Sequence, residues 1–268
     1  MSDIDIDNAE LAKWDPGFTE LATKLFAPII HRYFRAEVRG LEAIPPAGGV
    51  LLVSNHSGGA LTPDPLVFGP AFYNKLGYDR PLYILAHYGV FFTPLRSYLG
   101  RIGTIHASPE NAAKALHSGA AALVYPGGDF DAYRPTLSQN VIDFGGRTGY
   151  VRTAIQAGVP IVPAVSIGGQ ETQLFLTRGS WLAKLLGLKR IRMEILPVTI
   201  GLPFGVTLLF PANMPLPAKL VYHVLEPIDV VARFGKDPDV AEVDNHVRSV
   251  MQTALDRLGR QRRFPVLG

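Results

Sequence analysis

The sequence predicts an α/β fold, with a largely parallel or mixed central sheet flanked by helices and preceded by an N-terminal amphipathic helix. Across residues 50–165, short apolar runs typical of buried strands alternate with segments of helical periodicity. Such alternation is typical of a parallel sheet covered by helices. Polar, glycine-rich turns follow the apolar runs, and ligands bind at such turns in sheets of this class. The 268 residues are enough for a domain with a sizeable core.

The N-terminal part is predicted to comprise a flexible acidic tail over residues 1–10 and an amphipathic helical region over residues 11–36. Apolar residues recur at helical spacing between about residues 18 and 34, and they are Phe18, Leu21, Ala22, Leu25, Ile29, Ile30 and Tyr33. Two interpretations fit this stripe: a helix packed on the core, or a basic amphipathic helix lying on a membrane. Residues 37–268 are expected to form one further domain, which includes a C-terminal helix.

The remaining elements follow in order along the chain. Strands are predicted at residues 37–39, 50–54, 82–86, 102–106, 121–125 and 159–165. Helices are predicted at residues 65–73, 90–99, 109–117, 149–158 and 241–258. The helix at residue 109 has the clearest start, because Ser108 suits the cap and Pro109 suits the first helical position. Two prolines within residues 159–165 predict a strand at a sheet edge or beside a bulge.

The composition excludes several classes of protein. The chain has no cysteine, which excludes a disulfide scaffold, a thiolate zinc site and a cysteine nucleophile. Its net charge of +3 is too small by itself to indicate nucleic-acid binding. Neither the dinucleotide-binding nor the triphosphate-binding glycine motif occurs. The seven histidines show no His-x-x-x-His spacing, so no metal site is predicted. The N-terminus lacks the apolar segment of a secretory signal.

Two segments indicate contact with lipid. The uncharged stretch at 195–218 contains five prolines, so strands and loops with an apolar surface are expected there, with buried core as the alternative. Just before it, Leu, Phe and Trp residues are interleaved with the basic residues Arg178, Lys184, Lys189, Arg190 and Arg192. That run fits an anionic membrane surface or a solvated helix face. A chain of this kind is expected to lie on a membrane rather than cross it.

The segment after the predicted strand 50–54 carries the clearest chemistry. It contains His56 and, eight residues later, Asp64. A neutral imidazole can take a proton from a hydroxyl near physiological pH, and a carboxylate on its other nitrogen fixes the tautomer. Gly58 and Gly59 allow a substrate to approach the backbone closely. The other interpretation is a capped loop with a hydrogen-bonded structural histidine.

A second polar turn follows the predicted strand at 121–125. It comprises Tyr125, Pro126, Gly127 and Gly128, followed by Asp129, Asp131 and Arg134. Consecutive glycines after a strand can offer backbone N–H groups to an anion or an acyl oxygen. The aspartates could instead coordinate a cation or cap the next turn, and a plain turn is the simplest alternative.

With these motifs in order, the chain resembles the glycerophospholipid acyltransferase family, the lysophosphatidic acid acyltransferase-like enzymes. The segment 55–64 is similar to the family's His-acid motif, and residues 100–106 occupy the place of its second block. Residues 125–128 resemble its third block, and residues 159–163 resemble its final Val-Pro-Ile-Val-Pro block. The likeness covers about residues 38–228, which makes 37–268 the expected acyltransferase domain.

The resemblance implies direct acyl transfer from a thioester, usually acyl-CoA, to a lipid hydroxyl, without a metal or redox cofactor. His56 would be the general base, oriented by Asp64. The substrate-binding residues would be Asn55, Ser57, Gly58, Gly59, Tyr125, Pro126, Gly127, Gly128, Arg134 and Arg147. The expected partners are acyl-CoA, a lipid acceptor and an anionic membrane surface, with no nucleic acid. The expected location is peripheral, on the cytoplasmic face of a membrane.

The chain also departs from the family's pattern. Seven residues rather than the usual four separate His56 from Asp64, so Asp64 must reach the histidine through a longer loop, or another carboxylate serves. His106 stands near the place of an arginine, and the third block lacks its glutamate and the following Thr-Arg. These losses favour a neutral glyceride or another alcohol over a lysophosphatidic acid or lysophospholipid acceptor. Two other functions remain open: a non-catalytic lipid-binding protein, and a hydrolase of lipids or thioesters.

Overall fold

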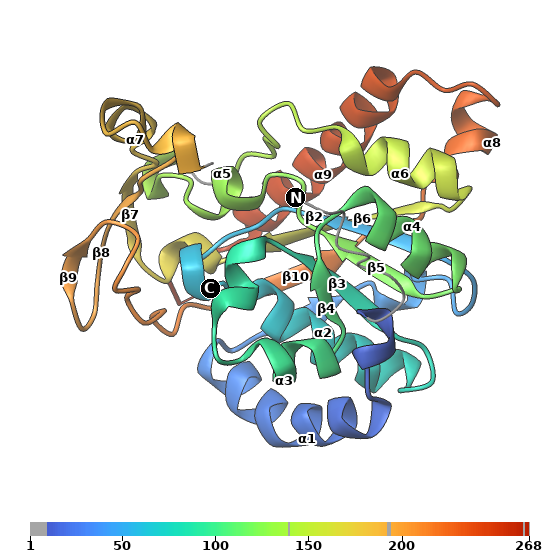
Figure 1. Cartoon of the computed structure of the whole chain (residues 1–268), viewed down its shortest axis with the longest axis horizontal. Helices are drawn as coiled ribbons and strands as arrows, with labels where there is room; N and C mark the ends of the chain where they lie inside the picture. The colour runs from blue at the N-terminus through green and yellow to red at the C-terminus, as the bar shows by residue number, and fades with distance from the viewer. Residues whose placement is uncertain (1–9, 139, 192–193, 265, 268) are drawn as a thin grey trace.

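The computed structural model describes residues 10–138, 140–191, 194–264 and 266–267. Among these residues, a seven-stranded sheet lies at the centre in the order β1-β10-β6-β2-β5-β3-β4 (Figure 1). Its strands are β1 (Glu37–Arg39), β2 (Val50–Ser54), β3 (Leu82–Ala86), β4 (Thr104–His106), β5 (Ala121–Val124), β6 (Ile161–Ile167) and β10 (Val221–Val224). The strands from β6 to β4 are parallel, whereas β10 runs antiparallel to β6 and pairs in parallel with β1. The predicted α/β class with a mixed, largely parallel sheet is confirmed.

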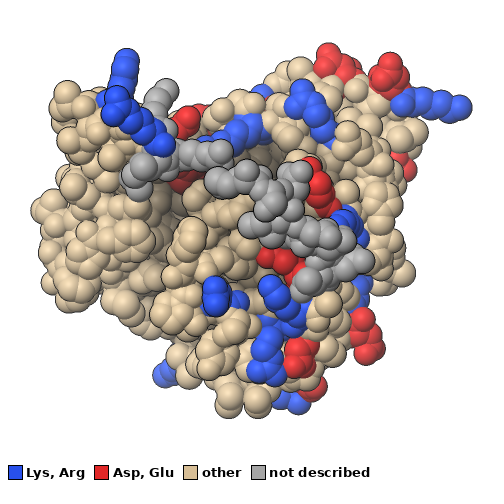
Figure 2. All heavy atoms as spheres, in the orientation of Figure 1, with Lys and Arg blue, Asp and Glu red and all other residues tan. Residues whose placement is uncertain are grey.

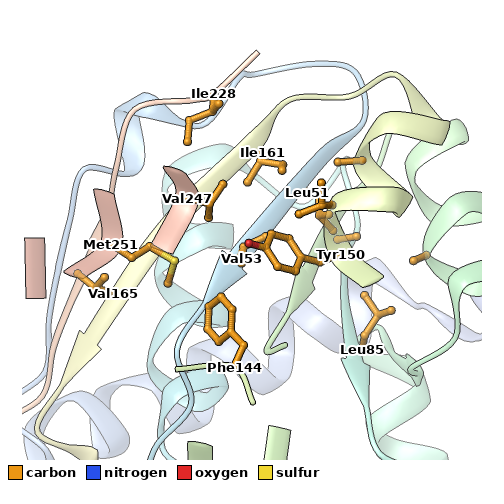
Figure 3. Close-up of a cluster of buried hydrophobic side chains, with 14 of the residues drawn as sticks. Leu51, Val53, Leu85, Phe144, Tyr150, Ile161, Val165, Ile228, Val247 and Met251 are labelled. Atoms are coloured by element: carbon orange, nitrogen blue, oxygen red, sulfur yellow. The ribbon is translucent and has the colours of Figure 1, made fainter. Parts of the chain in front are cut away.

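Helices cover both faces of this sheet (Figure 1). One face carries α4 (Pro109–His117), α6 (Gly149–Ala157) and α9 (Val240–Gln261), and the other carries α1 (Pro16–Tyr33), α2 (Asp64–Leu76) and α3 (Arg96–Arg101). Leu51 and Val53 of β2 face the first group, within the apolar cluster shown in Figure 3. Leu52, between them in sequence, packs with Phe68 of α2 in a second cluster. β2 is therefore buried on both faces, which explains its uninterrupted apolar sequence.

A smaller antiparallel sheet lies at one end of the molecule, at the left of Figure 1. It consists of β7 (Leu174–Thr177), β8 (Val198–Gly201) and β9 (Gly205–Thr207), with α7 (Ser180–Leu185) between β7 and β8. We call residues 174–216 the β7–β9 lobe. The remaining helices are α5 (Gly128–Ala132), α8 (Val230–Phe234) and the 3-10 helices η1 (Leu11–Lys13), η2 (Leu41–Ala43), η3 (Gly59–Leu61), η4 (Tyr88–Phe92), η5 (Thr136–Ser138), η6 (Gly169–Glu171) and η7 (Leu188–Ile191).

Most predicted elements occur where the sequence placed them. The strands at 50–54 and 82–86 have the predicted bounds, and the helix at 109–117 begins after Ser108, whose hydroxyl accepts from the backbone N–H of Asn111 at 3.1 Å. The helix predicted at 90–99 is wrong, because the chain forms η4 and then α3. Pro94 separates the two, and the residue before it, Thr93, is extended (φ −85°, ψ 154°). Proline disfavours the helical conformation at the preceding residue.

The proline-containing strand at 159–165 is also placed differently. It is β6 (Ile161–Ile167), which lies inside the sheet between β10 and β2, so the edge alternative is wrong, whereas the irregular pairing beside Pro163 agrees with the bulge alternative. Ala164 pairs with Val224, but Ile161 bridges Ile228, so the partner has one extra residue in this interval. Pro163 lies within that interval. It has no N–H to donate, and its carbonyl accepts from the N–H of Leu225 at 2.8 Å. An interior strand tolerates proline there because the ladder is already irregular.

The N-terminal helix is confirmed as α1, but its packing differs from the core-packing interpretation. Asp15 caps it by accepting from the N–H of Phe18 at 2.9 Å. The buried residues of α1 are Thr19, Thr23 and Ala27, whereas the large apolar residues of the predicted stripe, including Ile29, are mostly exposed. In the described part of the chain, no helix is long and apolar enough to span a bilayer. Of the predicted tail, residues 1–9 lie outside the described residues.

The basic run at 178–192 is only partly on the surface. The guanidinium of Arg178 lies 3.7 Å from the centre of the Phe130 ring, and its Nε donates to the carbonyl of Phe130 at 2.6 Å. Burial lowers the pKa of Arg178, although the residue remains a cation. It therefore ties the β7–β9 lobe to α5. Lys184 and Arg190 are exposed, and Arg192 lies outside the described residues.

Candidate active site

The candidate site lies where three neighbouring parallel strands end. β2 leads into the loop 55–63, β5 leads into Tyr125 and the glycine turn, and β6 leads into η6. Carboxyl ends of parallel strands lie at the same edge of a sheet, so these loops meet. The two polar turns that the sequence singled out are thus adjacent, because β2 pairs directly with β5.

His56 and Asp64 form a pair at this edge. The Nδ1 atom of His56 lies 3.3 Å from Oδ2 of Asp64, whose carboxylate is fully buried at the start of α2. The longer spacing is bridged by a tight loop, in which Gly58 and Gly59 have φ values of +89° and +69°. Those conformations suit glycine. A Cβ atom on Gly59 would lie 2.9 Å from Cε1 of Phe175, so this loop also packs closely against β7.

Besides the imidazole, four donor groups lie within hydrogen-bond distance of the Asp64 carboxylate, and the most distant is the hydroxyl of Thr62 at 3.4 Å from Oδ2. Oδ2 accepts from the backbone N–H of Ser57 at 2.7 Å, and Oδ1 accepts from the hydroxyl of Ser166 at 2.7 Å. The hydroxyl of Ser57 lies 3.1 Å from both oxygens. A carboxylate facing Nδ1 favours the tautomer with its proton there and leaves Nε2 as the basic nitrogen. The arrangement suits a general base.

The ring of Tyr125 lies against one face of the His56 imidazole. Its ring stacks on that of His56 with 4.3 Å between the ring centres and 25° between the planes. Burial raises the pKa of the Tyr125 phenol well above 10, so the hydroxyl stays neutral. Stacking limits rotation of the imidazole plane about the Cβ–Cγ bond of His56. Tyr125, predicted to bind substrate, thus contacts the candidate base itself.

A second carboxylate holds the backbone of His56. Oδ2 of Asp131, on α5, accepts from the N–H of His56 at 2.8 Å, while Oδ1 pairs with Nη2 of Arg134 at 2.7 Å. Arg134 also donates to the carbonyl of Asp143 at 3.0 Å. Burial raises the pKa of the Asp131 carboxyl, and Arg134 and the N–H of His56 oppose that rise. Arg134, predicted to bind substrate, is itself buried within this network.

The other predicted binding residues have mixed positions. Arg147 is half-exposed and is held by the carbonyl of Gly127 at 2.7 Å and by Oδ1 of Asp129 at 3.0 Å. The N–H of Gly128 donates to the carbonyl of Tyr125 at 3.0 Å, so this N–H is already engaged in a hydrogen bond within the turn. Asn55 exchanges two hydrogen bonds of 2.8 Å with the backbone of Ser166 and so joins the ends of β2 and β6. Pro126 lies in the same turn.

Two residues at the site, Ser166 and Gly169, were not singled out from the sequence, and Asp131 was expected only as a cation ligand or a turn cap. The sequence signal of these three residues is their position, since Ser166 lies near the end of the proline-containing strand, Gly169 follows that strand and Asp131 follows the glycine turn. A Cβ atom on Gly169 would lie 1.9 Å from Oγ of Ser57. A cavity of about 20 Å³ beside His56 is lined by Arg134, Ser166, Gln170 and neighbouring residues. That volume suits a water molecule rather than an acyl chain.

The second block of the resemblance ends outside this network. His106, at the end of β4, contacts the carboxylate of Glu10 through Nδ1, and its ring stacks on Phe91 at 3.8 Å between ring centres. The same carboxylate accepts from the side chain of Asn111 at 3.1 Å. Glu10, the last residue of the predicted tail, is therefore bound to the domain. Among the described residues, no group of three or more His, Cys, Asp or Glu side chains is placed to hold a metal ion.

Comparison with known proteins gives consistent similarities. A family model described as Acyltransferase matches residues 35–167. An uncharacterized protein of Mycobacterium tuberculosis is 32% identical over 93% of this chain and 69% of its own length. A Bos taurus protein named "DGAT1/2-independent enzyme synthesizing storage lipids" is 28% identical over 94% of this chain and 72% of its own. The crystal structure of the 1-acyl-sn-glycerophosphate acyltransferase PlsC from Thermotoga maritima has the same fold, with a TM-score of 0.51 at 17% identity, covering 89% of this chain and 82% of that one.

Proposed function

The chain belongs to the glycerophospholipid acyltransferase family and is an acyltransferase, and we propose that it transfers a fatty acyl group from acyl-CoA to a hydroxyl of a neutral glycerolipid. The observation that carries the mechanism is the His56–Asp64 pair at the carboxyl edge of the sheet, 3.3 Å apart. Acyltransferase activity and lipid metabolism follow from the family. The acyl donor, the acceptor class and the roles of individual residues are the proposal.

In the proposed reaction, Nε2 of His56 takes the proton of the acceptor hydroxyl as its oxygen attacks the thioester carbonyl. A carbon–oxygen bond forms and the carbon–sulfur bond breaks, and the proton passes from His56 to the departing CoA thiolate. Asp64 orients the imidazole and stabilises the imidazolium, as carboxylates do in histidine-based acyl transfer. Neither carbon nor sulfur changes oxidation state, so the proposal includes no redox cofactor, and His56 supplies the base without a metal.

Two observations support a neutral acceptor. Arg134, one of the two arginines among the predicted substrate-binding residues, is buried and paired with Asp131, and the other, Arg147, is engaged by Gly127 and Asp129. Phosphate recognition usually relies on guanidinium groups that can make bidentate contacts with the ligand. In addition, the name of the bovine relative refers to storage lipids. Monoacylglycerol and diacylglycerol are therefore the proposed acceptors, ahead of lysophosphatidic acid and lysophospholipid.

A thiol-release screen tests this proposal by crossing acyl-CoA chain lengths with neutral and phosphorylated acceptors. We expect CoA release that depends on monoacylglycerol or diacylglycerol. His56→Ala should lower the rate by about 10²- to 10⁴-fold, the usual contribution of a general base. Asp64→Asn should also lower it, and its melting temperature must be measured because Asp64 accepts from Ser57 and Ser166. His117→Ala, at an exposed position on α4, is the matched control.

Three results would contradict parts of this proposal. Full activity of His56→Ala would exclude the general-base mechanism. Faster turnover of lysophosphatidic acid than of any neutral acceptor would exclude the acceptor class. Rapid CoA release without any acceptor would indicate a thioester hydrolase, and lipid binding with no turnover on the whole panel would indicate a non-catalytic member of the family.

A further inference from the structure

The polarity of α1 is inverted relative to a helix on the surface of a water-soluble protein. Its buried residues are Thr19, Thr23 and Ala27, and Ile30 is partly buried against the cluster that includes Val67, while Leu25 and Ile29 are 56% and 66% exposed. The other exposed large apolar side chains on α1 are Leu21, Phe26 and Tyr33. A surface helix in water normally turns its apolar stripe toward the core. The outward stripe of α1 is therefore suited to a medium less polar than water.

The β8–β9 hairpin of the lobe shows the same inversion in a sheet. Thr199 and Thr207 point inward, where their hydroxyls share a hydrogen bond of 2.9 Å, while Val206 is 66% exposed. The exposed large apolar side chains of the lobe include Leu174, Leu176, Trp181, Leu185, Leu186, Ile200, Leu202, Phe204, Leu208, Phe210, Met214 and Leu216. An antiparallel sheet with one face in water normally places polar residues on that face. A patch with this many exposed apolar residues marks an interaction surface.

The two inverted elements adjoin one another. The hydroxyl of Tyr33, near the end of α1, donates to the carbonyl of Pro215 at the end of the lobe at 2.7 Å. Both residues that flank Pro215, Met214 and Leu216, have exposed side chains. The apolar stripe of α1 thus meets the apolar surface of the lobe, and Figure 1 shows the helix and the lobe along neighbouring sides of the molecule.

The charge around this surface is positive. Residues 172–225 contain the basic residues Arg178, Lys184, Lys189, Arg190, Arg192 and Lys219 but only one acidic residue, Glu194. In Figure 2 the lobe, at the left, presents a surface almost without charge, with Lys and Arg side chains at its upper end over α7. Lys184 and Arg190 are both exposed. Apolar surface bordered by cations fits the interface of a membrane that contains anionic lipid.

We propose that α1 and the β7–β9 lobe together form one docking surface for an anionic lipid bilayer. A second copy of the chain fits less well, because a two-fold interface places the same patch of each copy against the other. Lys184 and Arg190 would then meet like charges, with Glu194 the sole acidic residue that this segment offers. Anionic headgroups supply the missing negative charge.

This surface also borders the candidate site. Phe175, on the inner face of β7, packs against Gly59 in the loop that carries His56, while its sequence neighbours Leu174 and Leu176 face outward. On the other side, the ring of His31 on α1 contacts the carbonyl of Val67 on α2 at 3.2 Å, and α2 begins with Asp64. Docking would bring the lipid close to the loop that carries His56. The proposal goes beyond the proposed function, because binding to a bilayer requires no acyl transfer.

Vesicle co-sedimentation tests the proposal with the full chain. The probes are vesicles of phosphatidylcholine alone and of phosphatidylcholine mixed with phosphatidylglycerol. We expect binding to the mixed vesicles that weakens at high salt, because salt screens surface charge. Val206→Gln on the lobe and Ile29→Gln on α1 should each weaken binding by about tenfold, since each places a polar amide where an aliphatic group would enter the interface.

Val231→Gln on α8 is the matched control, because it makes the same substitution at a 48% exposed valine outside the proposed surface. It should bind as the unaltered chain does, and so should His56→Ala, which separates docking from catalysis. The proposal is overturned if neither vesicle binds at low salt, if Val231→Gln weakens binding as much as Val206→Gln, or if only one of the two elements matters. A dimer that Val206→Gln dissociates would overturn it in favour of self-association.

Discussion

At the scale of single residues, the imidazole of His56 is positioned by two carboxylates from different elements. Asp64 contacts the ring, and Asp131 accepts from the backbone N–H of the same residue. The stacked ring of Tyr125 adds a third constraint. A general base must keep its reacting nitrogen at one place to be effective, so residues that hold the backbone matter as well as those that hold the ring. In the proposed mechanism, Asp131 is therefore a positioning residue.

Asp131→Asn tests that role. The single side-chain oxygen of an asparagine can accept from His56 or from Arg134. Its amide hydrogens then face the other donor, which is buried and left without an acceptor. We expect kcat to fall by more than KM rises, a shifted acidic limb of the pH profile, and a lower melting temperature, because an unpaired buried donor costs about 1–3 kcal/mol. Steady-state kinetics across pH measure this.

Asp237→Asn, at an exposed position, removes the same charge and should leave kinetics and stability unchanged. If Asp131→Asn lowers the melting temperature but keeps kcat and the pH profile at temperatures where it is folded, Asp131 has a structural role alone.

At the scale of elements, the loop after β6 is in close contact with the loop after β2. Gly169 allows this, because a side chain there would collide with Oγ of Ser57, which also contacts Asp64. The restriction on Gly169 is one of space alone, since it does not have a positive φ. The final proline-containing block of the sequence thus serves the site through the turn that follows it.

Gly169→Ala should displace Ser57 and loosen Asp64. We expect a loss of about 1–3 kcal/mol in the free energy of unfolding, as is usual for overpacking a close contact, together with lower acyltransferase activity. Urea unfolding and CoA release measure the two effects. Gly149→Ala at the start of α6 is the control, because its Cβ atom would meet nothing within 4 Å. Equal stability and activity of the two variants would show that the loops after β2 and β6 are not in close contact.

At the scale of the whole molecule, strands that are far apart in the sequence pair near the edge of the sheet. This pairing partly buries titratable groups. His223, on β10, pairs in register with Arg39 on β1. Burial lowers the pKa of His223 below 6.5, and the charges of Arg39 and Arg257 lower it further. The unfolded chain therefore binds more protons than the folded one between the two pKa values. Stability from this group is fully present above pH 6.5 and is lost as the pH falls toward the folded pKa.

Replacing His223 by Gln should accordingly flatten the dependence of stability on pH on the acid side of neutrality. The measurement is the free energy of unfolding in urea at several pH values on either side of 6.5, the ordinary pKa of histidine. His117→Gln is the control for loss of an exposed imidazole. An unchanged slope in His223→Gln would contradict the prediction.

The sequence by itself determined the α/β class, most strands and helices, and the two turns that form the candidate site. These features follow from local chemistry: apolar runs form buried strands, Ser108 caps a helix, and glycines permit positive φ at Gly58. The helix predicted at 90–99 is wrong for an equally local reason, because Pro94 disfavours the helical conformation at Thr93. The polar pair His56 and Asp64 was likewise found from residue type and order.

Tertiary structure alone decided which groups meet and which faces are exposed. Asp131 and Arg134 are a local pair three residues apart, but the hydrogen bond from the N–H of His56 to Asp131 joins residues 75 apart, and no spacing in the sequence encodes that contact. Periodicity identified the apolar stripe of α1 but not its direction, since a helical stripe looks the same whether it faces a core or a bilayer. Only the packing of Thr19 and Thr23 against the domain shows that the stripe faces outward. Burial depends on contacts between segments far apart in the chain, and these are fixed by the assembled sheet.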